Sequence, residues 1–290
     1  MRWQTTGVVA LALAAGVLGA DAAAADDHVP ADAKICRKHD EKGKKKGETV
    51  HLGGGRHHYN GGDGNDRIYG GPKDDIINGG RGNDVVHGGG GNDVVCGGLG
   101  DDRVDGDEGR DRVYGEEQND YVTGGAGNDY INGQAGRDRV IGYGRRRGVV
   151  VADGRDFLDG SFDRDVLVAG GFDSLLGGAD DDRLSTRTRD EPVKKMDGYI
   201  GDDRISGSAA GDRRLLGDIG ADVIRGGGGD DRIDGGKSDD DLFGGGGDDL
   251  LQGGDNVDAL SGGDGEDVCD GGGSNRDTAD GTCVRVRDVP

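Results

Sequence analysis

Between Gly61 and Ile141 the chain repeats a nine-residue unit nine times in succession. The first four blocks read GGDGNDRIY, GGPKDDIIN, GGRGNDVVH and GGGGNDVVC. Glycines crowd the front of every block, position 6 is always Asp, and position 8 is always Val or Ile. A short, fixed period is typical of a solenoid, in which each unit packs on its neighbours. The repeat therefore predicts a stack of similar turns that each carry one carboxylate.

Within each block, positions 1–6 predict a turn and positions 7–9 predict a strand of about three residues, short enough to exclude hairpins. Glycines at positions 1, 2 and 4 allow positive φ angles. Position 8 points away from positions 7 and 9, so its apolar side chain is expected inside. Two blocks then complete one coil of eighteen residues, with a thin apolar layer between two parallel sheets. No helix is expected between Gly53 and Cys283, because glycine recurs throughout and no 3.6-residue apolar pattern is present.

Composition indicates that apolar burial alone cannot hold such a stack together. The net charge is −22, and 65 of the 290 residues are glycine, values at which a chain rarely buries enough apolar surface to offset its ordering entropy. Stacked aspartates at the strand spacing of roughly 5 Å repel by about 3 kcal/mol at an effective dielectric near 20. Ca²⁺ prefers carboxylate and carbonyl oxygens, Mg²⁺ demands tight octahedral geometry, and Zn²⁺ prefers His or Cys, which the turns lack. Calcium between the coils is therefore predicted.

The consensus GGxGxDxUx resembles the RTX, or haemolysin-type, calcium-binding repeat. The resemblance implies an all-β fold, a right-handed parallel β-roll (β-solenoid), in which multiple Ca²⁺ ions lie between coils and bind position-6 Asp and turn carbonyls. Glycine 4 is replaced in GGPKDD, GEEQND, GSAAGD and GGKSDD, and those turns are expected to bind more weakly. Asp173 lies in a block that is one residue short and is left outside the set. The metal-binding role falls on Asp66, Asp75, Asp84, Asp93, Asp102, Asp111, Asp120, Asp129, Asp138, Asp156, Asp165, Asp182, Asp203, Asp212, Asp222, Asp231, Asp240, Asp249, Asp258 and Asp267.

The N-terminus predicts export. Residues 1–25 combine one Arg, a short apolar run and small residues, as in a cleavable secretory signal peptide. The run is too short to span a membrane, so the protein is expected to be secreted and extracellular. Export permits disulfides among the four cysteines. We expect Cys269 to pair with Cys283 and Cys36 with Cys96; a free, outward-facing Cys96 is the alternative.

The repeat pattern divides the chain into segments. A polar N-terminal cap is expected at 26–52, a regular β-roll at 53–141, an irregular β-roll with insertions at 142–197, a second regular β-roll at 198–270 and a C-terminal cap at 271–290. The first insertion, 142–153, breaks the phase and is expected to be a loop or irregular coil; the second spans 186–197.

Neither an HExxH motif nor a GxSxG motif is present, and the stacked carboxylates are explained by metal binding, so the predicted function is non-enzymatic. The basic cluster at residues 37–46 lies beside an acidic body and predicts a solvated cap, with no nucleic-acid partner. We expect a calcium-binding structural module. The alternative is a calcium-dependent adhesin or effector, in which the irregular centre presents a face to an extracellular polysaccharide or a cell-surface protein. Exposed Tyr69, Tyr114, Tyr121 and Tyr130 would contribute to such a face.

Overall fold

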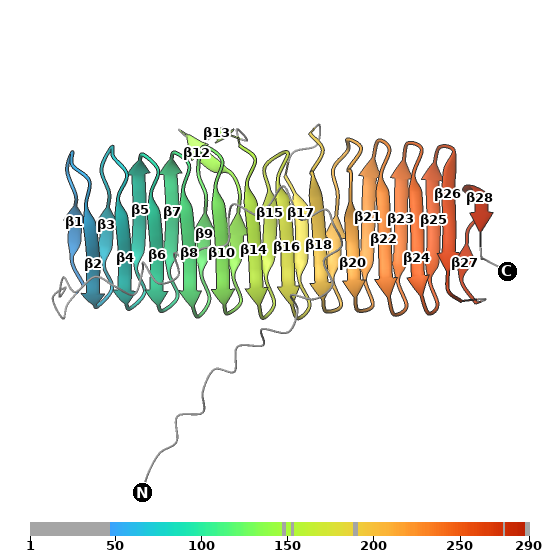
Figure 1. Ribbon diagram of the computed structural model, residues 1–290, viewed down its shortest axis with the longest axis horizontal. Helices are drawn as coiled ribbons and strands as arrows, with labels where there is room; N and C mark the ends of the chain where they lie inside the picture. Colours follow the sequence, from blue (N-terminus) through green and yellow to red (C-terminus); the bar gives the residue numbers. More distant parts are fainter. Residues whose placement is uncertain (1–46, 147–148, 152–153, 188–190, 275, 288–290) are drawn as a thin grey trace, which may run out of the picture. The chain divides into compact units, whose positions relative to one another are not determined.

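The computed structural model describes residues 47–146, 149–151, 154–187, 191–274 and 276–287, which lie within one compact unit. Every regular element in these ranges is a β-strand. The described residues therefore include no apolar helix of membrane-spanning length. Figure 1 shows the strands following one another side by side in chain order.

The strands form two parallel sheets of 13 strands each, and successive strands alternate between them. Sheet A contains β1 (Thr49–His51), β3 (Arg67–Tyr69), β5 (Val85–Gly90), β7 (Arg103–Glu108), β9 (Tyr121–Thr123), β11 (Arg139–Ile141), β15 (Val166–Ala169), β17 (Arg183–Thr186), β19 (Arg204–Ser206), β21 (Val223–Gly228), β23 (Asp241–Gly246), β25 (Ala259–Asp264) and β27 (Thr278–Ala279). Sheet B contains β2 (His58–Asp63), β4 (Ile76–Arg81), β6 (Val94–Leu99), β8 (Arg112–Glu117), β10 (Tyr130–Ala135), β14 (Phe157–Phe162), β16 (Ser174–Ala179), β18 (Lys195–Ile200), β20 (Leu215–Ile219), β22 (Arg232–Lys237), β24 (Leu250–Asp255), β26 (Asp267–Gly272) and β28 (Cys283–Arg287).

The nine-residue period sets the register of both sheets. In sheet A, Ile68 pairs with Val86 and Val86 with Val104, each eighteen residues apart. These position-8 side chains have no exposed surface and belong to one continuous core cluster. The predicted all-β parallel solenoid is therefore confirmed, and its core is one side chain wide on each sheet.

Most strands are longer than the three residues that the sequence predicts. In sheet B, for example, β4 and β6 have six residues each, because pairing continues through the glycines at positions 1 and 2 of the next block. Gly80 pairs with Gly98 and both have positive φ angles, of 112° and 118°. A Cβ on Gly98 would lie only 2.2 Å from the Gly80 carbonyl oxygen, so this close approach requires glycine.

The first insertion is not the irregular coil that the sequence predicts. Strands β12 (Gly144–Arg146) and β13 (Val149–Val151) form an antiparallel two-stranded sheet, in which Gly144 pairs with Val151. An insertion of this length can pair with itself, and a Val-rich segment has high strand propensity. The parallel stack continues across it, because β10 pairs directly with β14 and β11 with β15.

One predicted disulfide is confirmed: Cys269 in β26 bonds to Cys283 in β28, with the two Cα atoms 5.8 Å apart. Cys269 occupies a core position, so this bond ties the last strand of sheet B to the core. Cys96 is fully buried and disulfide-bonded, and no described cysteine is free, so the alternative of a free, outward-facing Cys96 is wrong. Its predicted partner, Cys36, lies outside the described residues.

Candidate metal centre

The position-6 aspartates lie in two rows along the stack. Row A immediately precedes the strands of sheet A and contains Asp66, Asp84, Asp102, Asp120, Asp138, Asp165, Asp182, Asp203, Asp222, Asp240, Asp258 and Asp277. Row B precedes or begins the strands of sheet B and contains Asp75, Asp93, Asp111, Asp129, Asp156, Asp173, Asp212, Asp231, Asp249 and Asp267. All of these side chains are buried, none with more than 5% of its surface exposed. The structure thus places every sequence-predicted site residue in one of the two rows.

Hydrogen bonds join each row from coil to coil. In row A, the Asp84 N–H donates to Asp102 Oδ1 over 2.7 Å, and the Asp102 N–H donates to Asp120 Oδ1 over 2.8 Å. In row B, the Asp93 N–H donates to Asp111 Oδ1, also over 2.8 Å. Each carboxylate therefore uses one oxygen to hold the backbone of the neighbouring coil, which explains why position 6 is invariant in the regular blocks.

The second carboxylate oxygen, Oδ2, has no hydrogen-bond partner in most of these residues although it is buried. Atoms of this kind normally require a partner, because an unsatisfied buried polar atom costs about 1–3 kcal/mol. They belong to Asp66, Asp84, Asp93, Asp102, Asp111, Asp120, Asp138, Asp165, Asp182, Asp203, Asp222, Asp231, Asp240, Asp249, Asp258, Asp267 and Asp277.

Glycine at position 1 keeps space beside these oxygens. A Cβ on Gly97 would lie 2.5 Å from Asp102 Oδ2 and 2.7 Å from the carbonyl oxygen of Gly115. The two polar atoms nearest to this point are therefore a carboxylate oxygen and a carbonyl oxygen. This donor set fits a hard cation that prefers oxygen ligands, as Ca²⁺ does.

Burial makes the charged form of these carboxyls unfavourable. Burial raises the pKa of Asp93 to about 7, of Asp111 to about 8 and of Asp120 to about 9. The backbone hydrogen bond to each carboxylate opposes this rise, and neighbouring carboxylates add to it. Towards the N-terminal end of row A the effect is smaller, and burial raises the pKa of Asp84 to about 6. Without a cation, Asp111 and Asp120 therefore favour their protonated form near neutral pH.

Three turns differ from the others, because in them a backbone N–H satisfies Oδ2. Gly71 donates to Asp75 Oδ2 over 2.8 Å, and Gly170 and Ser208 donate to Asp173 and Asp212 Oδ2, each over 2.7 Å. In these three carboxylates both oxygens therefore accept a hydrogen bond from the protein itself.

The conformation of the fourth turn residue separates the two kinds of turn. In regular turns this residue has a positive φ angle, as at Gly100 with φ of 136°. Gln118 and Ser238 keep that conformation, with φ angles of 77° and 90°, although they replace glycine. Lys73 and Ala210 do not adopt positive φ, and their turns end at Asp75 and Asp212, whose Oδ2 accepts a backbone hydrogen bond. The blocks GGPKDD, GEEQND, GSAAGD and GGKSDD are therefore two different cases.

Sequence reasoning missed two members of the rows. Asp173 is buried, and its Oδ1 accepts the Asp156 N–H over 2.9 Å. Asp277 Oδ1 accepts the Asp258 N–H over 3.0 Å. Both follow blocks of irregular length, so counting in nines could not find them; an Asp shortly before an apolar strand residue was the available signal. Row B also has a gap, since the buried Val193 takes an aspartate's place and its N–H donates to Asp212 Oδ1 over 2.8 Å.

One expectation about the surface is wrong. Tyr114 is 1% exposed, and its ring lies 5.9 Å from that of Tyr130, so it cannot contribute to an exposed aromatic face. Tyr69, Tyr121 and Tyr130 are partly exposed.

One comparison with known proteins, the match to a repeat family, agrees with the geometry of the rows. Among curated proteins, none matches this sequence. Among solved structures, the chain is similar to a hyperactive, Ca²⁺-dependent, β-helical antifreeze protein from an Antarctic bacterium, with 16% identity, a TM-score of 0.44, and coverage of 83% of this chain and 85% of that one. The family of RTX calcium-binding nonapeptide repeats matches at residues 60–95, 97–131, 114–144, 151–173, 168–187, 216–251 and 243–276. These matches cover more than half of the sequence, so the chain belongs to the RTX calcium-binding nonapeptide-repeat family.

Proposed function

We propose that this calcium-binding β-roll is a secreted, non-enzymatic module whose coils assemble when Ca²⁺ binds the position-6 aspartates. The observation that carries the proposal is the set of buried Oδ2 atoms without hydrogen-bond partners, which recurs along both rows. Many of these atoms lie beside a position-1 glycine and a backbone carbonyl oxygen, as Asp102 Oδ2 lies beside Gly97 and the Gly115 carbonyl. Bound calcium would supply the positive charge that these oxygens lack.

Three sets of atoms in the β-roll have different roles in this assembly. The Oδ1 atoms hold adjacent coils together through backbone N–H groups, as Asp102 does for Asp84. The Oδ2 atoms and the carbonyls of position-1 glycines face the space for the cation. The position-8 side chains, such as Val86 and Val104, close the core between the sheets. Folding and calcium binding are therefore one coupled process, because the oxygens converge only when the coils stack.

Extracellular calcium fits the energetics of this coupling. A site filled at 100 times its dissociation constant adds about 2.7 kcal/mol to the free energy of unfolding. Extracellular calcium modules typically bind with dissociation constants of about 10⁻⁴–10⁻³ M. Several sites of this kind would stabilise a chain of net charge −22 outside the cell and leave it unfolded where calcium is scarce.

Far-UV circular dichroism during a calcium titration tests the proposal, with magnesium as the matched control. We expect a cooperative transition from coil to β-structure in calcium and none in magnesium at equal concentration. A folded spectrum in chelator at pH 8 would contradict it, since the disulfide and the apolar core would then suffice.

The alternative function, a calcium-dependent adhesin, draws on one specific observation. Phe162 and Phe172 in the irregular centre are 64% and 46% exposed, and an exposed aromatic ring is a common surface for stacking on sugars and proteins. Polysaccharide pull-down with calcium and with chelator tests it. Calcium-dependent retention that Phe162→Ser abolishes would support it, and retention unchanged by that substitution would oppose it.

A further inference from the structure

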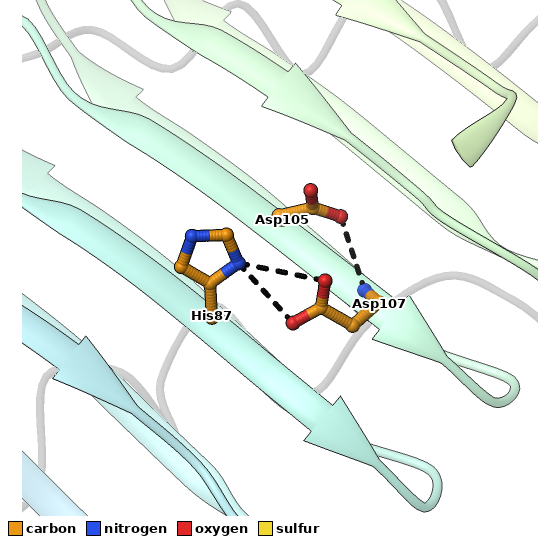
Figure 2. Close-up of side chains that lie close together, drawn as sticks. All are labelled: His87, Asp105 and Asp107. Carbon is orange, nitrogen blue, oxygen red and sulfur yellow. Dashed lines mark hydrogen bonds and ion pairs between the residues drawn. The ribbon is translucent and has the colours of Figure 1, made fainter. Parts of the chain in front are cut away.

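Outside the two rows, three metal-ligating side chains gather on the outer surface of sheet A. They are His87 in β5 and Asp105 and Asp107 in β7, and one ligand atom from each lies within 4.8 Å of the other two. Figure 2 shows the His87 ring facing Asp107, with Asp105 beside them. Unlike the oxygen-only rows, this cluster contains an imidazole nitrogen.

The parallel register brings the three side chains together. His87 pairs directly with Asp105 in the ladder between β5 and β7, so the two lie side by side on the outer face. Asp107 is two residues beyond Asp105 and therefore lies on the same face of β7. Asp107 also replaces the glycine at position 2 of its block, and it has a positive φ angle of 68°.

Packing fixes these groups in place. The His87 ring stacks on Tyr69 with centroids 5.2 Å apart and planes 5° apart, and Tyr69 stacks in turn on His51. This column of rings directs His87 Nδ1 toward Asp107, at 3.2 Å and 3.4 Å from its two oxygens. Asp105 Oδ1 accepts the Asp107 N–H over 3.1 Å. The ligands are therefore oriented by neighbouring groups, which reduces the cost of binding an ion.

We propose that His87, Asp105 and Asp107 bind a divalent transition-metal ion of the zinc class. Zinc ligands lie about 2.0–2.2 Å from the metal, so two of them at a tetrahedral angle are about 3.4 Å apart, close to the separation of His87 Nδ1 from Asp107. One imidazole and two carboxylates form the protein part of a tetrahedral site with water as the fourth ligand. Calcium fits poorly here, because it takes six to eight oxygen ligands.

The cluster is accessible to an ion in the folded protein. The side chains of His87 and Asp107 are 28% and 33% exposed. An open groove of about 680 Å³ lies alongside, and its lining includes Asp107, Glu108 and the paired glycines Gly89 and Gly90. Metal can therefore enter, and water can complete its coordination, while the β-roll stays intact.

A simple ion pair between His87 and Asp107 is the competing explanation of this geometry. It accounts for one carboxylate, whereas the structure sets a second, Asp105, beside the same imidazole. Two adjacent carboxylates repel, and a divalent ion compensates both charges where a protonated imidazole compensates one.

Zinc titration of the calcium-saturated protein tests the proposal. Calorimetry measures the zinc affinity, and modification with diethyl pyrocarbonate, read by peptide mass spectrometry, measures how far zinc protects each histidine. We expect zinc to protect His87 from modification. His87→Ala and Asp107→Asn should each lower zinc affinity by at least about 10-fold. The matched control, His58→Ala, removes an exposed histidine from sheet B and should leave that affinity unchanged.

Circular dichroism in calcium shows whether each variant keeps the β-roll, so a loss of zinc binding with an unchanged spectrum belongs to the site. The proposal is overturned if zinc leaves His87 unprotected, or if His87→Ala binds zinc as the parent does; in either case the cluster is an ion pair only. Equal losses in His87→Ala and His58→Ala would also overturn it. The measurement does not depend on where calcium binds.

Discussion

Two row B turns of the irregular centre, which end at Asp173 and Asp212, carry the same aspartate as the turns that end at Asp102 and Asp120 but treat it differently. In the regular stack, Asp102 and Asp120 use Oδ1 to hold a neighbouring coil and leave the buried Oδ2 without a hydrogen-bond partner. In the segment 170–212, Asp173 and Asp212 hold a coil in the same way, but a backbone N–H from their own turn fills Oδ2. The structural role of the aspartate is therefore separate from its capacity to bind a cation.

The conformation of the fourth turn residue differs between these two outcomes. A positive φ angle at this residue, as at Gly100 and Gln118, accompanies an unpartnered Oδ2 at Asp102 and Asp120. Ala210 lacks that conformation, and the Ser208 N–H reaches Asp212 Oδ2 instead. Val193 takes the place of an aspartate in row B. Its backbone N–H donates to Asp212 Oδ1 in the next coil, but its side chain offers no ligand for a cation. We infer that row B holds the roll together with less dependence on calcium at Asp173 and Asp212, whereas Asp182 and Asp203 of row A keep an unpartnered Oδ2 in the same segment.

The largest expected effect is that of pH on the calcium-free chain. The folded-state pKa values of Asp111 and Asp120, about 8 and about 9, lie above the ordinary 3.8 because of burial. A raised folded pKa stabilises the fold below the ordinary pKa, and that stability is lost as pH rises through the folded value. In chelator, the β-roll should therefore be most stable near pH 4 and unfold between about pH 6 and pH 9.

Circular dichroism across this pH range, with and without millimolar calcium, measures the effect. Calcium should abolish the loss above pH 6, because the charged carboxylates are then compensated. A calcium-free chain that is equally stable at pH 4 and pH 9 would show that the carboxyls of the regular stack are not destabilised by burial.

Matched double substitutions should separate the two kinds of turn. Asp93→Asn with Asp111→Asn removes two adjacent carboxylates of the regular stack, and each lost site removes about 2.7 kcal/mol at 100 times its dissociation constant. The calcium concentration at the folding midpoint should rise several-fold. Asp173→Asn with Asp212→Asn removes carboxylates whose Oδ2 already accepts a backbone hydrogen bond, so no calcium site is lost and the calcium midpoint should rise by much less.

Circular dichroism during calcium titration gives the calcium midpoint of each double variant. Guanidinium unfolding gives the free energy of unfolding of each variant. Equal shifts of the calcium midpoint in the two double variants would refute the distinction between turns whose Oδ2 accepts a backbone hydrogen bond and turns whose Oδ2 has no partner.

A smaller effect is expected at the fourth turn residue itself. Gln118 has a φ angle of 77°, a conformation that costs a non-glycine residue about 1–2 kcal/mol. Gln118→Gly should relieve this cost and raise the free energy of unfolding in calcium by up to about 1 kcal/mol after the entropy of glycine is counted. Lys73→Gly is the control, because Lys73 is not left-handed and gains nothing. A gain at Lys73 equal to that at Gln118 would contradict the assignment.

The sequence predicted what the nine-residue period controls. Position 8 lies in the core, position 6 stacks in rows, and the sheets are parallel, because each follows from repeating one unit every eighteen residues along a coil. It did not predict the hairpin formed by β12 and β13, which depends on how an insertion pairs with itself.

The sequence also did not distinguish turns whose Oδ2 accepts a backbone hydrogen bond from turns whose Oδ2 has no partner. Lys73 and Gln118 both replace glycine 4, yet only Gln118 adopts the left-handed conformation. The φ angle of this residue depends on the backbone of the whole turn and on the coil stacked on it, so residue type alone does not determine it. The cluster of His87 with Asp105 and Asp107 likewise required the strand register, since its members come from separate blocks.

The most direct test of the central claim is a crystal structure of the protein grown in calcium, with anomalous diffraction recorded at a wavelength where calcium scatters strongly. We expect anomalous peaks in two rows, each peak within about 2.3–2.6 Å of an unpartnered Oδ2 such as that of Asp102 or Asp231. We expect weaker peaks, or none, at Asp173 and Asp212. Rows of carboxyls without peaks, or peaks confined to surface acidic residues, would contradict the account.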